Sequence, residues 1–259
     1  MIPPAVRVAV CVFVLALAPP GASTTRTPVA LTAAPARVVL AGTPRTAVRL
    51  TNSGTKRLVV DVSRAGFALS LRGRPRILRA GGARSAAAWL KLRPKRLALP
   101  ARASASLLVS ARVPPNAEPG DHDALVLLTT RPSVGARVAV RVRLGVVVVV
   151  RAPGTVVRQL ELAGLRVARH GGRRVLELRV ANHGNVTETL PRARVTLSRA
   201  RTHRRLATLL AARRDVRPHT RGILELRLRR RLRGAVSARV VIPAVPGRRP
   251  IRRTYAIRL

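Results

Sequence analysis

The stretch from Val134 to Arg151 constrains the fold of this chain most, because it first alternates apolar and polar residues and then becomes wholly apolar. The apolar positions Val138, Val140, Val142 and Leu144 alternate with Arg137, Ala139, Arg141 and Arg143. A period of two is typical of a strand with one buried face, and the valine run Val146–Val150 is typical of a strand buried on both faces. We therefore predict one long strand region with a bend or bulge at Gly145 and an end at Pro153-Gly154.

The composition of the chain also favours β-structure. Hydrophobic residues make up 47% of the 259 residues but aromatic residues only 2%, so valine, leucine and alanine must supply the core. Valine-rich alternation favours sheets over helices. The length is sufficient for two domains of ordinary size.

The segment Met1–Ser23 has the pattern of a secretory signal peptide. One basic residue, Arg7, precedes an apolar run from Val8 to Ala18, and small residues follow. The apolar run is too short to span a bilayer. Cys11, the only cysteine, lies inside this segment, so the mature chain is expected to have no disulfide. We predict a secreted, extracytoplasmic protein that is associated with the cell envelope and has no transmembrane helix in its mature form.

Short strands separated by turn signals fill both halves of the mature chain. The first half offers strands near Ala36–Ala41, Thr46–Thr51, Arg57–Ser63, Ala87–Leu92, Ala103–Val113 and Ala124–Thr130. The second half offers strands near Leu160–Ala168, Val175–Ala181, Ala193–Leu197, Ile223–Leu228, Val236–Ile242 and Ile251–Leu259. Gly73–Ala83 is interpreted as a basic loop, and Arg204–Arg213 fits either a helical turn or a strand. This pattern predicts an all-β fold of antiparallel sandwiches.

The two halves repeat one plan. Val48–Gly54 parallels Leu178–Gly184, since each reads as a strand followed by Asn-x-Gly, which suits a tight turn with positive φ. Later, Leu99-Pro100 parallels Val216-Arg217-Pro218. We predict two tandem immunoglobulin-like sandwiches, one at residues 24–152 and one at 153–259, after the signal peptide at 1–23.

The chain is strongly basic, with 51 Lys+Arg, 9 Asp+Glu and a formal net charge of +42. Two interpretations are open: attraction to a polyanion, or a compositional preference for arginine at solvent-facing strand positions. The candidate anion-binding residues are the densest basic run, Arg227, Arg229, Arg230, Arg231 and Arg233. This run fits either a solvated strand face and turn or an anion-binding edge. As an anion-binding edge it would bind an anionic cell-envelope polymer, and salt would weaken that binding.

Three segments of the chain resemble bacterial immunoglobulin-like surface domains. They are Trp89–Pro94, Leu97–Ala101 and Val113–His122, and the second half adds Asn182–Asn185. The two-domain order is similar to the WxL-interacting cell-surface proteins of Gram-positive bacteria and, more distantly, to the periplasmic pilus chaperones. The resemblance implies a binding or scaffolding role on the envelope, with another surface protein as a possible partner. The chaperones imply an alternative, in which an exposed edge holds a partner segment by strand addition.

This chain departs from those families in two ways. His122 stands where a corner tyrosine is usual, and neither the membrane helix nor the basic tail of the WxL-interacting proteins is present. The Arg and Lys with which pilus chaperones hold a subunit's carboxylate have no assignable position among so many arginines.

The acidic group Glu118, Asp121, His122 and Asp123 has two interpretations. It offers ligands for a metal ion, or it forms a turn in which Asp121 bonds to nearby backbone and His122 packs at the corner. Trp89 is interpreted as a core residue rather than as a ligand platform.

No constellation typical of an enzyme is found. His170, His183, His203 and His219 are expected in turns and loops without metal-ligand spacing, and the chain shows no triad or carboxylate pair. We therefore predict a non-enzymatic protein with no cofactor, no metal and no small-molecule substrate. The lack of interleaved aromatics argues against sequence-specific nucleic-acid binding.

Overall fold

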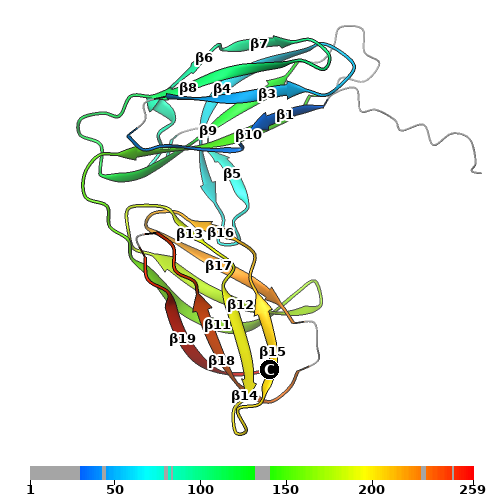
Figure 1. Ribbon diagram of the computed structural model, residues 1–259, viewed down its shortest axis with the longest axis vertical. Coiled ribbons are helices and arrows are strands. Elements are labelled where there is room, and N and C mark those ends of the chain that lie inside the picture. Colours follow the sequence, from blue (N-terminus) through cyan, green and yellow to red (C-terminus); the bar gives the residue numbers. More distant parts are fainter. Residues whose placement is uncertain are drawn as a thin grey trace, which may run out of the picture.

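The structure, a computed structural model, describes residues 30–42, 45–78, 81–82, 84–131, 141–228, 232–246 and 248–259. It consists of two β-sandwiches that follow one another along the chain (Figure 1). The all-β, two-sandwich prediction is confirmed. The signal peptide predicted at residues 1–23 lies outside the described residues, and the boundary at 152/153 stays a prediction, although the strand β10 does end at Ala152.

The first sandwich pairs two sheets. One sheet has the order β1 (Leu31–Ala34), β3 (Arg45–Asn52), β8 (Ser104–Ala111) and β6 (Leu90–Arg93). The other has the order β2 (Arg37–Leu40), β10 (Arg143–Ala152), β9 (Gly120–Thr130), β4 (Leu58–Leu69) and β5 (Pro75–Leu78), with β7 (Arg96–Leu99) also paired to β4. A short 3₁₀ helix, η1 (Ala87–Trp89), precedes β6. All these pairings are antiparallel except that of β2 with β10.

The second sandwich has two main sheets and one small sheet. One main sheet has the order β11 (Leu160–His170), β12 (Arg173–Asn182) and β17 (Thr220–Arg227). The other has the order β15 (Arg205–Leu210), β14 (Arg194–Arg199), β18 (Ala235–Ile242) and β19 (Ile251–Arg258). The small sheet joins β13 (Glu188–Leu190) to β16 (Arg214–Val216).

Each sandwich has its own apolar core between its two sheets. The largest fully buried side chains are Leu50, Leu58, Leu90, Leu99, Leu107, Leu128, Leu176, Leu178, Leu190, Leu197, Leu226 and Ile242. Full burial of one such side chain contributes roughly 1.5–3 kcal/mol. The core therefore follows the aliphatic composition, as predicted.

The predicted long strand region is β10, which begins at Arg143. Residues 132–140, where the alternation starts, lie outside the described residues. Within β10, Val146, Val148 and Val150 are buried in the first core. β10 has no bulge at Gly145, because it pairs with β9 in unbroken register through this position, so that part of the prediction is wrong. The glycine instead makes room for the side chain of Leu125, which occupies the space that a Cβ at Gly145 would need.

One further segment differs from its predicted structure, and for another the structure decides between two alternatives. The predicted loop Gly73–Ala83 contains the strand β5, which forms a hairpin with the end of β4. This β4–β5 hairpin extends from the first sandwich towards the second (Figure 1). The ambiguous segment Arg204–Arg213 contains a strand, β15, and no helix.

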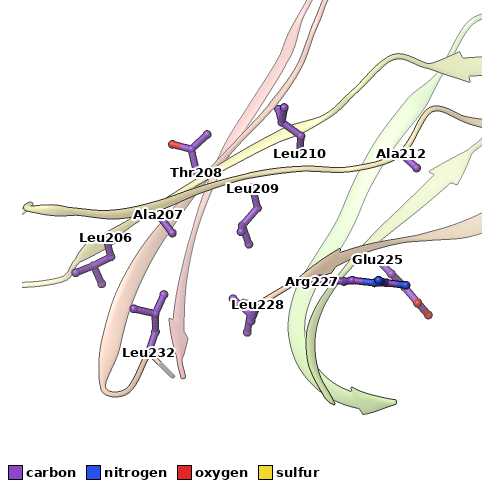
Figure 2. Close-up of a pocket in the computed structure, with 10 residues that line it drawn as sticks. All are labelled: Leu206, Ala207, Thr208, Leu209, Leu210, Ala212, Glu225, Arg227, Leu228 and Leu232. Carbon is purple, nitrogen blue, oxygen red and sulfur yellow. The ribbon is translucent and has the colours of Figure 1, made fainter. Parts of the chain in front are cut away.

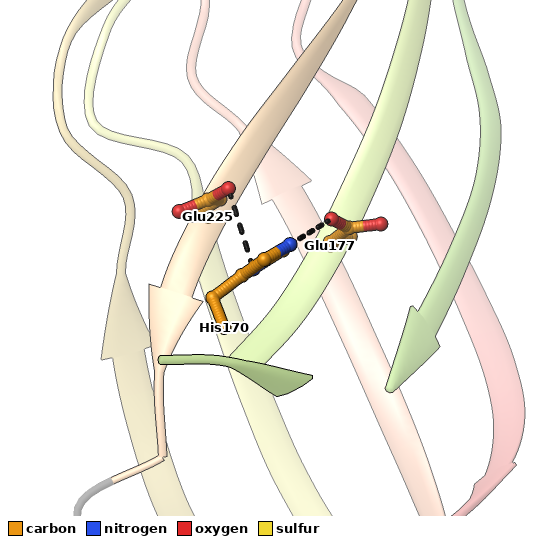
Figure 3. A group of neighbouring side chains, drawn as sticks. All are labelled: His170, Glu177 and Glu225. Carbon is orange, nitrogen blue, oxygen red and sulfur yellow. Dashed lines mark ion pairs between the residues drawn. The ribbon is translucent and has the colours of Figure 1, made fainter. Parts of the chain in front are cut away.

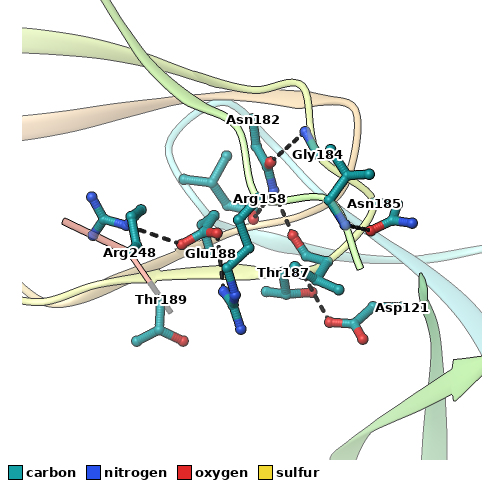
Figure 4. Close-up of polar contacts among 12 residues, drawn as sticks. Asp121, Arg158, Asn182, Gly184, Asn185, Thr187, Glu188, Thr189 and Arg248 are labelled. Carbon is teal, nitrogen blue, oxygen red and sulfur yellow. Dashed lines mark hydrogen bonds and ion pairs between the residues drawn. The ribbon is translucent and has the colours of Figure 1, made fainter. Parts of the chain in front are cut away.

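The internal repeat is confirmed by two buried asparagines in equivalent places. Asn182 donates from Nδ2 to the backbone oxygens of Val186, Val216 and Arg217, and its Oδ1 accepts from the Gly184 N–H (Figure 4). In the first sandwich, Asn52 donates from Nδ2 to the backbone oxygens of Lys56, Leu99 and Pro100, and Gly54 N–H donates to its Oδ1. The match of Leu99-Pro100 with Val216-Arg217 therefore has a structural cause.

The turn prediction at these two motifs needs a correction. Neither Gly54 nor Gly184 is among the described residues with positive φ. Gly184 is required for space instead, because a Cβ there would clash with the backbone oxygen of Val157.

Candidate functional site

The acidic group in and before β9 joins the two sandwiches. Asp121 receives Arg151 Nε at 2.7 Å, and its second oxygen accepts the backbone N–H of Thr187 in the second sandwich at 2.8 Å (Figure 4). Asp123 pairs with Arg217, also in the second sandwich. The carboxylates are thus bound by arginines and backbone. Asp121 does accept a backbone N–H as expected, but from Thr187, 66 residues further along the chain, rather than from its own turn.

Asp121, His122 and Asp123 lie in the strand β9 rather than in the predicted turn, but His122 does pack against a neighbouring side chain as that interpretation expected. Glu118 pairs with Arg84, and His122 Nε2 lies 2.7 Å from the backbone oxygen of Glu118. The His122 ring packs on Trp89 with a centroid distance of 4.4 Å. Trp89 is half-buried against the first core, so its interpretation as a core residue is confirmed.

Arg217 reaches from the second sandwich to the first. Its Nη1 donates to the Phe67 backbone oxygen at 2.7 Å, and its guanidinium carbon lies 4.9 Å from the centroid of the Phe67 ring. Asp123 is almost fully buried, and this burial raises its pKa although Arg217 opposes the shift. Arg37 of β2 and Asp215 of β16 add another ion pair across the interface.

The β4–β5 hairpin supplies Arg72 to a second cluster, on the surface of β12 and β17. Arg72 binds Glu177 at 2.9 Å and Glu225 at 2.5 Å, and Arg166 binds the other oxygen of Glu177 at 2.6 Å. His170, which ends β11 rather than lying in a loop, is 3.6 Å from each glutamate (Figure 3).

This cluster is the one group in the described part of the chain whose geometry resembles a metal site. Its ligand atoms lie within 4.8 Å of one another. A cation here would have to displace the guanidinium groups of Arg72 and Arg166, which already neutralise Glu177. We therefore interpret it as a clamp between the hairpin and the second sandwich.

Glu177 gives this clamp a pH dependence. Burial alone would raise the pKa of Glu177, but Arg166 and Arg72 outweigh it and hold the pKa below its ordinary value. A lowered pKa means that the carboxylate stabilises the fold above about pH 4.5 and that this contribution is lost as the pH falls. At pH 7, Glu177→Gln is expected to lower the free energy of unfolding by about 1–3 kcal/mol.

Urea titrations of the wild type and the variant at neutral and acid pH test this prediction. The difference should shrink as the pH falls below about 4.5 and through the lowered pKa of Glu177. Glu161→Gln is the matched control and should change little, because Glu161 is exposed and its one ion pair among the described residues is with His183. A difference for Glu177→Gln that persists unchanged at acid pH would contradict the role of its charge.

Only two of the five predicted anion-binding arginines are among the described residues. Arg227 is the exposed last residue of β17, and Arg233 is exposed just before β18. Arg229, Arg230 and Arg231 lie outside the described residues. Anion binding by these five residues stays a prediction.

An open edge lies on one side of the second sandwich. Among the described strands, β15 pairs only with β14 and β17 pairs only with β12, so both strands end their sheets. Between them is a groove of about 640 Å³. Its lining is mainly aliphatic: Leu206, Ala207, Leu209, Leu228 and Leu232, with Thr208, Leu210, Ala212, Glu225 and Arg227 around them. Leu209 points from β15 towards Leu228, whereas Thr208 and Leu210 point the other way (Figure 2).

The backbone of β15 is available along this edge. Ala211 N–H donates to the oxygen of Ala193 directly opposite, so alternate residues of β15 bond towards β14. The N–H and C=O groups of Thr208 and Leu210 consequently point away from β14. β15 carries one charge, on Arg205, whereas the edge strand β19 carries three arginines.

A second open edge is found on β10. β2 covers only Val147–Val150, and no described strand pairs with Arg143–Val146 on that side. The remaining described edge strands of the first sandwich are four residues long each: β1, β2, β5, β6 and β7. Sequence patterns did not reveal the β15 groove, because it depends on which strands end the two sheets.

Two tandem immunoglobulin-like sandwiches define the structural class in which the two-domain pilus chaperones are found. The YadV chaperone has a TM-score of 0.50 and 11% identity, over 87% of this chain and 98% of that chain. A chain from the CFA/I fimbrial chaperone–tip adhesin complex has a TM-score of 0.49 and 10% identity, with the same two coverages of 87% and 98%. A chain from the Salmonella enterica SafA pilin–SafB chaperone complex has a TM-score of 0.48 and 13% identity, over 88% of this chain and 97% of that chain.

The likeness to YadV confirms the immunoglobulin-like fold, which is all that it shows at this identity. No family model matches the chain, and no curated protein matches it. The predicted resemblance to the WxL-interacting family therefore finds no support. No helix in the described ranges is long and apolar enough to cross a membrane.

Proposed function

We propose that this chain is an exported, non-enzymatic binding protein that holds an extended segment of a partner protein by β-strand addition. The observation that carries this proposal is the unpaired edge of β15 beside an aliphatic groove. Strand addition needs free backbone groups along an edge and pockets for alternate side chains. β15 offers both, whereas native proteins usually protect such an edge with charge or make it very short.

The fold supports this choice over a scaffold that only binds envelope polymers. YadV, whose fold this chain shares, is a chaperone. The acidic residues support a non-enzymatic role, because all 9 of them form ion pairs with arginine or histidine side chains. A carboxylate committed to a guanidinium is a poor general base.

The charged residues at the rim of the β15 groove suggest which kind of partner segment would bind there. Arg205, Arg213 and Arg227 are exposed near the ends of β15 and β17. An extended segment with apolar residues at alternate positions and acidic residues at its ends fits both the groove and this rim. A labelled peptide of alternating valine and serine with aspartates at both ends is therefore the probe.

Hydrogen exchange with this peptide tests the site. The amides of Thr208 and Leu210 are expected to become protected, because their N–H groups point to the open edge. Protection at Arg143 and Gly145 instead would transfer the same function to β10. Protection at neither edge would contradict strand addition.

Thr208→Pro removes one outward N–H without breaking the bonds to β14. We expect at least about tenfold weaker peptide binding in fluorescence anisotropy, since one backbone hydrogen bond and the close approach of the strand are lost. Thr254→Pro is the matched control. The Gly234–Leu259 backbone pair implies that Thr254 N–H also points outward, but from the charged edge β19. Equal loss in both variants would contradict the assignment to β15.

A further inference from the structure

Four arginines surround one cavity at the end of the second sandwich that lies away from the first. Arg169 comes from β11, Arg174 from β12, Arg233 from the residues before β18, and Arg258 from the end of β19. The cavity has a volume of about 830 Å³ and is also lined by Val167, Gly172, Gly234 and Leu259. It therefore brings together cationic groups from both sheets.

Backbone pairing fixes this arrangement. Gly234 and Leu259 exchange two backbone hydrogen bonds of 3.1 and 3.0 Å, which hold the residue next to Arg233 against the end of β19. Arg174 Nη1 donates to the Leu232 oxygen at 2.8 Å and ties the β11–β12 hairpin to the same segment. The cavity is thus framed by paired strand ends.

No acidic side chain lines this cavity. Arg169 and Arg174 lie directly opposite each other in the β11–β12 ladder, and like charges at such positions repel. None of the four arginines forms an ion pair with a described residue, while every acidic residue of the chain is engaged elsewhere. A bound anion would remove this repulsion.

We propose that this cavity binds an anion that carries more than one phosphate group. Guanidinium groups match phosphate oxygens in forked geometry, and one phosphate offers enough oxygens to be shared by several arginines. A carboxylate has two oxygens and satisfies fewer donors. The volume of the cavity exceeds what a single phosphate fills, so linked phosphates or clustered phosphate head groups suit it best. This site is independent of the β15 groove and of strand addition.

Titration calorimetry of the mature chain with inorganic tripolyphosphate tests the proposal, with citrate as the carboxylate comparison. The variant Arg169→Gln/Arg258→Gln removes two exposed guanidiniums that have no protein partner among the described residues. We expect tripolyphosphate to bind about a hundredfold more weakly to it, or about tenfold for each lost charge-assisted contact. Arg192→Gln/Arg239→Gln, at two exposed arginines elsewhere on the same sandwich, removes the same charge and should cost much less.

Vesicle-binding experiments distinguish lipid head groups from a soluble phosphate compound as the ligand. Binding to phosphatidylglycerol vesicles but not phosphatidylcholine vesicles, lost in the Arg169/Arg258 variant alone, would assign the site to lipid head groups. Binding to tripolyphosphate without vesicle binding would assign it to a soluble phosphate. The proposal would be overturned if citrate bound as tightly as tripolyphosphate, or if both double variants lost the same affinity. It would also be overturned if the protein bound neither tripolyphosphate nor vesicles. Thermal melting of each variant verifies that it is folded.

Discussion

Replacement of Asn182 by alanine is expected to lower the free energy of unfolding of the second sandwich by about 3–5 kcal/mol. The side chain is 1% exposed and bonds to three backbone oxygens and one N–H. Alanine would leave these groups buried without partners, and each such group costs about 1–3 kcal/mol. The measurement is urea unfolding followed by circular dichroism, together with calorimetry to separate transitions of the two sandwiches.

The repeated architecture supplies the controls for this prediction. Asn52→Ala should cause a loss of similar size in the first sandwich, because Asn52 makes the same set of bonds there. Asn116→Ala, at an exposed position, should change stability by less than about 0.5 kcal/mol. If Asn182→Ala unfolds with the same free energy as Asn116→Ala, the hydrogen bonds of Asn182 do not stabilise the second sandwich.

Gly120→Ala is expected to disrupt the packing of the two sandwiches against each other. Gly120 has φ +108°, and a Cβ there would lie in the space of the Asn185 backbone oxygen. Positive φ costs an alanine about 1–2 kcal/mol. The clash would also break the bonds from Asp121 N–H to Asn185 and from Thr187 N–H to Asp121, for a total loss of roughly 3–5 kcal/mol.

Small-angle scattering and limited proteolysis of the connection 153–159 detect this change. The variant should be more extended and more quickly cut, with each sandwich still folded. Gly42→Ala is the matched control, since Gly42 has φ +73° but nothing within 4 Å of a Cβ. The Gly42→Ala variant should lose only the free energy that positive φ costs an alanine, and the interface between its sandwiches should stay intact. Identical scattering of both variants and the wild type would show that contact at Gly120 does not set the arrangement.

The sequence was sufficient to predict two β-sandwiches because period-two alternation is a local property. Long strands such as β12 and β18 contain enough alternations to stand out. The strands β1, β7, β13 and β16 have only three or four residues each, and such windows contain too few alternations to be distinguished from loops. The glycine and proline near β5 predicted a loop, where the structure has a hairpin held by β4.

The interface and the groove were beyond prediction for a different reason. With 51 basic residues for 9 acidic ones, each carboxylate has many possible partners, and only the fold selects Arg151 for Asp121 or Arg217 for Asp123. The groove beside β15 likewise depends on strand order. The Asn-x-Gly repeat was the one local signal of this kind, and it correctly marked two equivalent buried sites.

The complete engagement of the acidic residues has a consequence for how copies of this molecule meet. Because arginine or histidine side chains already pair with all 9 acidic residues, the remaining surface charge is almost entirely of one sign. Two copies approaching edge to edge along β15 would bring cations towards cations, at a range of about 8 Å in physiological salt. The chain can therefore leave uncovered a strand edge that carries a single charge, without offering it to itself, while an acidic segment of another protein is drawn towards the same edge. Selectivity against self-pairing would thus reside in the whole surface rather than in the strand.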